Sequence, residues 1–199
     1  VIEAVVENLQ VKQELLARIE RYWKPGTIVS SNTSGISINE MVAGRDEGFR
    51  SHFLGTHFFN PPRYMKLLEL IPGESTAPEV TALMRRFCSK TLGKGVVIAK
   101  DTPNFIANRI GTYGLLITLQ EMIRGGHTVE EVDAVTGPAL GRPKSATFRT
   151  LDLVGLDTFM FVADNVYRNV TDEAEKQAFT PSGLLQSMVE RGWLGEKSG

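Results

Sequence analysis

Short apolar runs alternate with longer amphipathic stretches over the first half of the chain. The runs are rich in Val, Ile, Leu and Phe and have the length of buried strands; they cover residues 1–6, 27–31, 53–59, 67–71 and 96–99. The sequence between them carries helical spacing, and we predict helices over residues 9–24, 36–42 and 77–92. This alternation is typical of an α/β fold, in which helices cover the faces of a sheet.

Two of these helices have apolar faces that can be assigned from spacing. Asn8 is the expected N-cap of the first helix. Its apolar side chains recur in steps of four, four and three, at Val11, Leu15, Ile19 and Tyr22, which is helical spacing. In the helix over residues 77–92, Leu83, Phe87 and Cys88 fall on one side. Both helices are therefore expected to pack one side against the sheet.

The second half of the chain carries no strand pattern and is expected to be all-helical. Asp101, followed by Thr and Pro, has the features of a helix start, and we expect a long helix from there to about Arg124. We place a domain boundary near Lys100, with an α/β part over residues 1–100 and a helical part over residues 101–199.

Further helices are expected beyond the glycines that end this long helix. Thr128 and Glu131 have the spacing of a capping box at the start of the next one. Residues 146–169 predict either one buried helix or two helices broken near Gly155, and residues 182–191 predict the last helix.

Composition and charge exclude several classes of function. The sequence has 22 Lys and Arg against 23 Asp and Glu, so its net charge of −1 argues against nucleic acid or an anionic membrane surface as the main partner. The single cysteine excludes an internal disulfide and a Cys-rich metal site, and it fits a reducing compartment. No apolar run has the length of a membrane span, and the first residues lack the features of a signal peptide. We therefore expect a cytoplasmic protein with no resident metal.

A local cluster of polar residues suggests catalytic chemistry. Ser31 to Ser34 follow a predicted strand, at the end of an α/β sheet where ligands bind. His57 and Glu69 lie in the next two strands, and a carboxylate flanked by leucines is costly to bury without a partner. If the two strands are neighbours, Glu69 can orient the imidazole of His57 as a general base. A core histidine bonded to the backbone and a glutamate at a strand edge would give the same pattern.

Several segments together resemble one enzyme family. They are the residues 1–8 (VIEAVVEN), 31–34 (SNTS), 57–61 (HFFNP), 68–71 (LELI), 100–109 (KDTPNFIANR), 152–158 (DLVGLDT) and 195–199 (GEKSG). In this order they resemble the L-3-hydroxyacyl-CoA dehydrogenases of fatty-acid β-oxidation over essentially the whole chain. Residues 61–65 (PPRYM) and 142–148 (RPKSATF) are similar to the long bacterial forms, which also carry an enoyl-CoA hydratase module.

The resemblance implies a fold and a set of roles. The fold would be the second half of a Rossmann-like NAD-binding domain followed by a helical C-terminal domain. His57 would be the general base for the 3-hydroxyl proton and Glu69 would orient it, while Ser34 and Asn108 would bind the substrate oxygen. The residues implied to line the cofactor NAD are the Ala4 backbone, Glu7, Lys12, Asn32, Asn60 and Lys197.

Structural roles are open for the same residues when they are taken one at a time. Ser34 could cap the helix that begins near residue 36, and Asn108 could bond the backbone inside a helix. Glu7, Lys12 and Lys197 could be solvated surface charges.

The resemblance also implies parts and partners outside this sequence. The family's glycine fingerprint, G-x-G-x-x-G, is absent here, so we expect a piece of a longer protein that by itself binds NAD poorly and is nearly inactive. The expected partners are acyl-CoA substrate, NAD, a second copy bound through the helical domain, and a fused or separate enoyl-CoA hydratase. Two alternatives are a related dehydrogenase for a free hydroxy acid and a non-catalytic dimerisation fragment.

Overall fold

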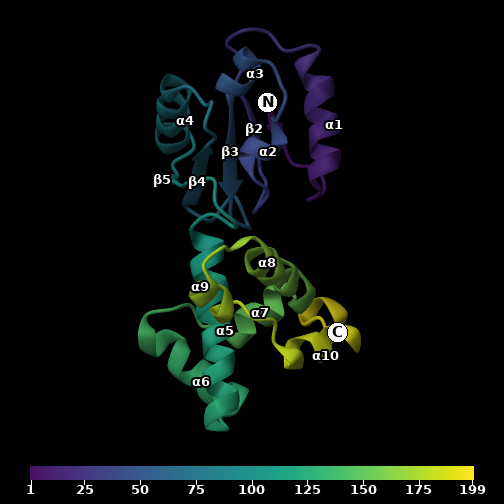
Figure 1. The fold of residues 1–199 in the computed structure, drawn as a ribbon. Coiled ribbons are helices and arrows are strands. Elements are labelled where there is room, and N and C mark those ends of the chain that lie inside the picture. Colours follow the sequence, from purple (N-terminus) through teal and green to yellow (C-terminus); the bar gives the residue numbers. More distant parts are fainter. The chain divides into compact units, whose positions relative to one another are not determined.

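The computed structural model describes residues 1–199 as two compact units, Val1–Ile106 and Ala107–Gly199. The first unit is built around a sheet and the second is entirely helical (Figure 1). The α/β part followed by an all-α part was predicted from the sequence and is confirmed. The expected boundary near Lys100 lies a few residues before the division seen here.

The first unit contains a five-stranded sheet with the spatial order β1-β2-β3-β4-β5. Its strands are β1 (Ile2–Glu3), β2 (Val29–Ser31), β3 (Phe53–Phe58), β4 (Leu67–Pro72) and β5 (Gly95–Ile98). Strands β1, β2 and β3 are mutually parallel, β4 runs antiparallel to β3, and β5 is parallel to β4. All three residues of β2 and the first five of β3 are buried, as expected for interior strands of a sheet covered on both faces.

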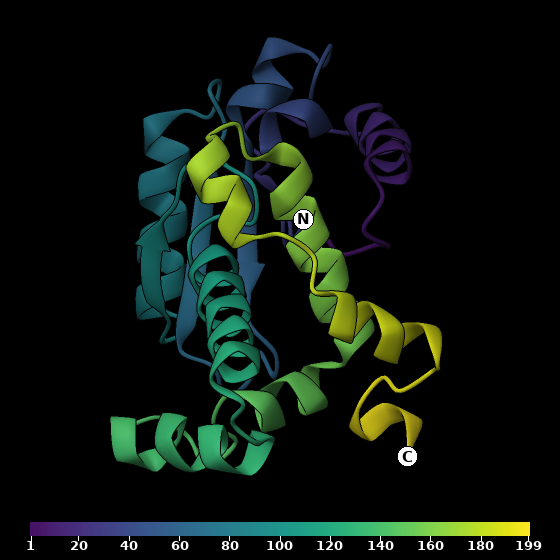
Figure 2. The same ribbon diagram turned by 60° about the horizontal axis from the view of Figure 1, so that its bottom comes forward.

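Helices cover the two faces of this sheet, with α4 (Pro78–Lys90) on one side and α1 (Leu9–Glu20) on the other (Figures 1 and 2). Two short helices, α2 (Ile38–Met41) and α3 (Glu47–Ser51), pack on the α1 side. The core on that side is formed by Leu16, Val29, Ile38, Met41, Val42, Phe49, Phe53, Ile71, Ala99 and Phe105. The core under α4 is formed by Leu54, Leu68, Leu70, Val80 and Cys88.

The predicted helices α1 and α4 are confirmed, but their fully buried positions differ from most of the apolar residues whose spacing predicted them. In α1 the fully buried positions are Lys12 and Leu16, whereas Tyr22, which follows the helix, is 85% exposed. In α4 the buried positions are Val80 and Cys88, whereas Leu83 and Phe87 are almost half exposed. Each helix carries more apolar residues than one buried stripe can hold, so helical spacing alone does not identify the buried positions.

Local hydrogen bonds determine where α1 begins and where β1 ends. The Asn8 side chain accepts a hydrogen bond from the Val11 amide at 3.1 Å, which confirms the predicted N-cap. The predicted strand over residues 1–6 is only Ile2–Glu3, because the Val5 amide and carbonyl bond to side chains instead of a neighbouring strand.

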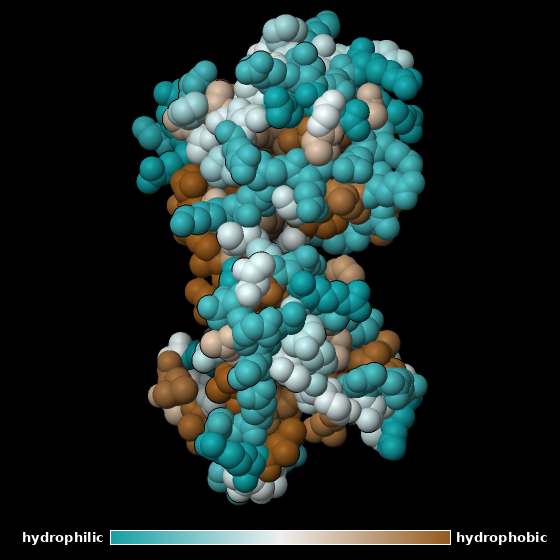
Figure 3. Space-filling view, in the orientation of Figure 1, coloured by the Kyte–Doolittle hydropathy of each residue, from teal (hydrophilic) through white to brown (hydrophobic).

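The second unit packs six α-helices and two 3₁₀ turns. The helices are α5 (Ala107–Gly125), α6 (Val129–Thr136), α7 (Phe148–Val154), α8 (Leu156–Asn169), α9 (Glu173–Ala178) and α10 (Gly183–Glu190). The 3₁₀ turns are η1 (Pro138–Leu140) and η2 (Glu196–Ser198). The core of this unit is formed by Leu116, Leu119, Leu151, Leu156, Phe159, Ala163, Val166, Val170, Phe179 and Leu185. Apolar side chains also reach the surface of this unit, where Figure 3 shows brown areas.

One prediction for this unit is confirmed, one was wrong, and the structure decides between the two alternatives for residues 146–169 in favour of two helices. Thr128 and Glu131 form the capping box of α6, and Gly155, at φ +94°, separates α7 from α8. Asp101 does not begin a helix, since α5 starts only at Ala107. Its carboxylate instead caps α2, which is more than 60 residues earlier in the chain.

Candidate active site

His57 and Glu69 are directly opposite each other on the antiparallel strands β3 and β4. Opposed residues of such a pair project from the same face, so the register alone brings the two side chains together. His57 Nδ1 lies 2.7 Å from Glu69 Oε2, and the two side chains are 4% and 1% exposed. The rings of Phe59 and Phe105 lie against the imidazole, with centroids 4.4 Å and 5.7 Å from its own.

This contact determines which nitrogen of the imidazole can act as a base. A carboxylate only accepts hydrogen bonds, so Nδ1 carries the proton and the lone pair of the neutral ring lies on Nε2. Glu69 Oε1 in turn accepts a bond from the Ile106 amide at 3.1 Å. Both carboxylate oxygens of this buried acid therefore have donors, which offsets the cost of burying its charge.

A second buried polar cluster lies at the carboxyl ends of β1 and β2. Lys12, 1% exposed, places its Nζ 2.8 Å from Glu3 Oε1, 3.1 Å from the Val5 carbonyl and 3.3 Å from Glu7 Oε2. Glu3 also accepts bonds from the Ser31 hydroxyl at 2.5 Å and the Val5 amide at 2.6 Å. All three ammonium protons of Lys12 have acceptors, so this residue supports its neighbours from inside the protein.

Glu7 connects this cluster to the loop after β2. Its Oε1 accepts bonds from the Thr33 hydroxyl at 2.5 Å and from the Ser34 amide at 2.8 Å. Thr33 Oγ1 accepts a bond from the Ile36 amide at 2.9 Å, so the loop is held from both sides. Ser37, and not Ser34, is the N-cap of α2, which corrects the capping role considered for Ser34.

The other expected cofactor residues of this unit follow the ends of β1, β2 and β3. Ala4 is exposed and directly follows the buried Glu3. Asn32 Oδ1 accepts a bond from the Phe58 amide at 3.0 Å, which connects the loop after β2 to the end of β3. Asn60 is exposed just beyond β3, and its peptide bond to Pro61 is cis.

The remaining two expected site residues belong to the helical unit. Asn108 lies in the first turn of α5. Lys197 lies in η2, forms an ion pair with Asp157, and has its Nζ 3.5 Å from the Thr158 hydroxyl. The side-chain hydrogen bond from Lys197 and the backbone bond from Thr158 hold the pKa of the Asp157 carboxyl below its usual value.

Several residues that hydrogen-bond to the candidate site residues or support them were not identified from the sequence. Glu3 is buried between apolar neighbours, so the burial argument used for Glu69 would also have identified it. Thr33 lies inside the predicted motif but was given no role of its own. The observed bonds of Asp101 and of the Ile106 amide have no signal in the sequence, because their partners are 37 to 64 residues away.

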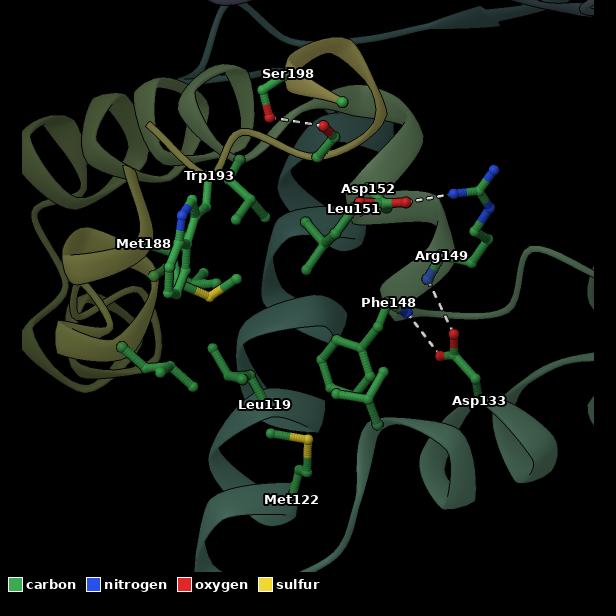
Figure 4. A pocket seen from close by; sticks show the side chains of 16 residues that line it. Leu119, Met122, Asp133, Phe148, Arg149, Leu151, Asp152, Met188, Trp193 and Ser198 are labelled. Atoms are coloured by element: carbon green, nitrogen blue, oxygen red, sulfur yellow. Dashed lines mark hydrogen bonds and ion pairs between the residues drawn. The ribbon is translucent and has the colours of Figure 1, made fainter. Parts of the chain in front are cut away.

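A separate pocket of about 450 Å³ is lined entirely by residues of the helical unit (Figure 4). Its lining is mostly apolar and includes Leu119, Met122 and Met188. At one side, the Asp133 carboxylate accepts bonds from the Phe148 and Arg149 amides at the start of α7. None of the residues predicted for catalysis lines this pocket.

Comparison with known proteins identifies the family. A family model described as the NAD binding domain of 3-hydroxyacyl-CoA dehydrogenase matches residues 1–102, and the model of the C-terminal domain matches residues 105–199. The chain therefore belongs to the 3-hydroxyacyl-CoA dehydrogenase family, as the sequence resemblance indicated.

Three similar proteins illustrate this relationship. A protein of Bacillus subtilis named "Probable 3-hydroxyacyl-CoA dehydrogenase" is 60% identical over 199 residues, which are 100% of this chain and 25% of the relative. A Rickettsia felis protein described as a trifunctional enzyme of a fatty acid oxidation complex is 34% identical over 99% of this chain and 28% of its own length. The crystal structure of M. tuberculosis FadB2 superposes with a TM-score of 0.90 at 37% identity, covering 100% of this chain and 67% of that one.

The chain thus spans only about a quarter of the two relatives and two thirds of the solved structure. None of its helices combines the length and the apolar composition needed to cross a membrane.

Proposed function

We propose that the protein containing this chain catalyses NAD-dependent oxidation of L-3-hydroxyacyl-CoA to 3-ketoacyl-CoA. The observation that carries the proposal is the buried contact between His57 and Glu69, which leaves the lone pair of the ring on Nε2. Membership of the 3-hydroxyacyl-CoA dehydrogenase family supports the substrate class.

In this proposal His57 is the general base. Its Nε2 takes the proton of the 3-hydroxyl group during oxidation and returns it during reduction of the ketone. Glu69 holds the ring in the required tautomer and stabilises the imidazolium formed when the proton arrives. Because both side chains are almost fully buried, their electrostatic interaction is stronger than it would be in water.

Ser34 and Asn108 are proposed to position the substrate oxygen. A hydroxyl and a side-chain amide are hydrogen-bond donors suited to an oxygen that passes between alcohol and ketone. Ser34 is suited to such a role because its amide is bonded to Glu7 and its loop is fixed by Thr33. Asn108 has a regular helical backbone to hold it, in the first turn of α5.

The polar groups at the carboxyl ends of β1 and β2 fit the amide and hydroxyl groups of a nicotinamide riboside. Glu7 has a side chain that is 27% exposed and Ala4 is an exposed residue, so both lie where a ligand could reach them. Asn32, Asn60 and Lys197 are assigned to the same cofactor by resemblance, and Lys12 supports Glu7 from inside. Bound NAD would accept the hydride of the substrate.

The proposal also covers how residues 1–199 bind NAD when they are separated from the rest of the protein. Residues 1–199 contain no G-x-G-x-x-G, the sequence that places a helix N-terminus against the pyrophosphate of a dinucleotide. We therefore expect these residues alone to bind NAD weakly and to turn over little substrate. Calorimetric titration with NAD that gave a micromolar dissociation constant would contradict this expectation.

The proposed partners follow from the same family relationship. We propose a homodimer formed through the helical unit, whose surface carries exposed apolar residues such as Leu153, Val154 and Phe161. We also propose a fused or separate enoyl-CoA hydratase, supported by the description of the Rickettsia felis relative.

A cytoplasmic location is consistent with one buried, unpaired cysteine. Sedimentation of the naturally encoded protein, that is, the whole protein that contains this chain, tests the dimer.

The substrate class is tested by comparing a thioester with its free acid. The naturally encoded protein is supplied with NADH and either acetoacetyl-CoA or acetoacetate, and the loss of NADH is followed. The proposal predicts efficient turnover of the thioester and little of the free acid. The reverse preference would identify a dehydrogenase of free hydroxy acids, and turnover of neither would favour a non-catalytic role.

A further inference from the structure

We propose that Asp101 is a positioning residue for the His57–Glu69 pair and acts through the connecting segment, residues 101–106. The inference rests on the proposed function of His57 as a base. Asp101 touches neither of the two residues; it fixes one end of a short segment whose other end bonds to Glu69.

The Asp101 carboxylate fastens the start of the connecting segment to α2. Its Oδ1 accepts a bond from the Ile38 amide at 2.9 Å. Its Oδ2 accepts bonds from the Ser37 hydroxyl at 2.8 Å and from the Asn39 amide and side chain at 2.9 and 2.8 Å. Four donors on one carboxylate make a rigid attachment, and hydrogen bonds to a charged group are among the stronger ones in proteins.

The middle of the segment has a backbone that only a fixed environment would maintain. Asn104 and Phe105 have φ values of +57° and +53°, a left-handed conformation that asparagine tolerates but that is unfavourable for phenylalanine. Both are 2% exposed, and Phe105 packs into the same core as Ile38 and Ile71. The consecutive left-handed residues turn the chain so that the next amide, that of Ile106, faces Glu69.

The end of the segment completes the support of the Glu69 carboxylate. A terminal carboxylate rotates over a broad range about its last bond, so one hydrogen bond leaves its plane poorly defined. Here Oε2 bonds to His57 and Oε1 to the Ile106 amide, and two bonds on different oxygens fix that plane. The Phe105 ring, 5.7 Å from the imidazole between centroids, also limits how the histidine can turn.

Loss of the Asp101 carboxylate should therefore loosen the imidazole without removing any group that acts on the substrate. We expect Asp101→Ala to lower kcat about tenfold or more, because small errors in the position of a catalytic group are costly. KM should change little, since substrate binding is not the step affected. Asp101→Asn keeps one acceptor oxygen and should lie between Asp101→Ala and the wild type.

The chain offers a matched control in Asp46. This residue is the N-cap of α3 in the same unit, and its Oδ1 accepts a bond from the Gly48 amide at 2.8 Å. Asp46→Ala thus removes a helix-capping carboxylate, as Asp101→Ala does, but one that bonds within α3 and does not hold residues 101–106. The comparison separates a general loss of stability from a specific effect on the imidazole.

The experiment combines steady-state kinetics with ¹⁵N NMR of histidine-labelled, naturally encoded protein, which reports the tautomer of His57 independently of activity. The proposal predicts a smaller Nδ1-protonated fraction and a lower kcat in Asp101→Ala, a partial change in Asp101→Asn, and neither change in Asp46→Ala. Should Asp101→Ala fail to fold, Asp101→Asn and Asp46→Asn give the same comparison.

Equal tautomer fractions and equal kcat in the Asp101 and Asp46 variants would overturn the inference. Failure of the proposed function has a different signature. In that case His57→Gln would retain turnover, whatever the NMR spectra show for Asp101.

Discussion

Replacement of Lys12 by methionine removes the cation from a buried cluster that contains two carboxylates. With Lys12 present, the charges of Glu3, Glu7 and Lys12 add to −1; without it they add to −2. The Glu3 side chain has no exposure to solvent and keeps only the Ser31 hydroxyl and the Val5 amide as donors. We therefore expect Lys12→Met to destabilise the first unit.

The size of the effect follows from the burial of each partner. Breaking a buried pair by removal of one partner costs about 3–5 kcal/mol. Glu7 is 27% exposed and is partly screened by water, so the lower end, about 3 kcal/mol, applies. Glu3→Gln leaves Lys12 paired with Glu7 and should cost only about 1–3 kcal/mol. The double variant should cost less than the sum of the single ones, because the two residues interact directly.

Urea unfolding followed by fluorescence measures this cost in the correct unit. Trp23 packs against the core of the first unit, whereas Trp193 is in the helical unit and 55% exposed. In residues 1–199 carrying Trp193→Phe, Trp23 is the remaining tryptophan, so the fluorescence reports the first unit. An unchanged m value with a midpoint lowered by about 1–3 M urea is expected for Lys12→Met. A loss of less than about 1 kcal/mol, which is typical of exposed pairs, would refute the description of Lys12 as a buried, paired cation.

Two further predictions concern the helical unit. Gly195 has φ +97°, and a Cβ at this position would collide with the Asp152 carbonyl. A Cβ at Gly192, which also has a positive φ, would meet no neighbouring atom. Gly195→Ala should therefore lower the free energy of unfolding by about 1–3 kcal/mol more than Gly192→Ala. Thermal unfolding of both variants measures the difference, and equal losses would contradict the collision. Lys197→Met should raise the pKa of Asp157 toward its ordinary value, as read by ¹³C NMR titration. Because the folded pKa is lowered, the stability that Asp157 contributes is present above its unfolded pKa and is lost as pH falls through the folded pKa; an unmoved pKa would exclude the pair.

Features that depend on neighbouring residues in the sequence could be predicted. The Asn8 cap, the capping box at Thr128 and the break at Gly155 involve residues no more than a few positions apart. The strands around His57 and Glu69 were also predictable, because each is a short apolar run with one polar residue. Their direct pairing depends on the sheet order, and the sequence could only suggest it.

Features that depend on distant partners could not be predicted. Lys12 would be expected at the surface of α1, because lysine is rarely buried unless it is paired with an acid. In the folded chain Glu3 and Glu7 are these acids. Asp101 was expected to start its own helix and instead caps α2, since the donors at Ile38 and Asn39 become its neighbours only after folding.

The catalytic proposal is tested most directly by His57→Gln in the naturally encoded protein. The variant is supplied with saturating L-3-hydroxybutyryl-CoA and NAD, and NADH formation is followed while NADH affinity is measured separately by fluorescence. Loss of a general base predicts a kcat lower by about 10²–10⁴-fold with unchanged NADH affinity. A kcat close to that of the wild type would show that the imidazole beside Glu69 is not the base.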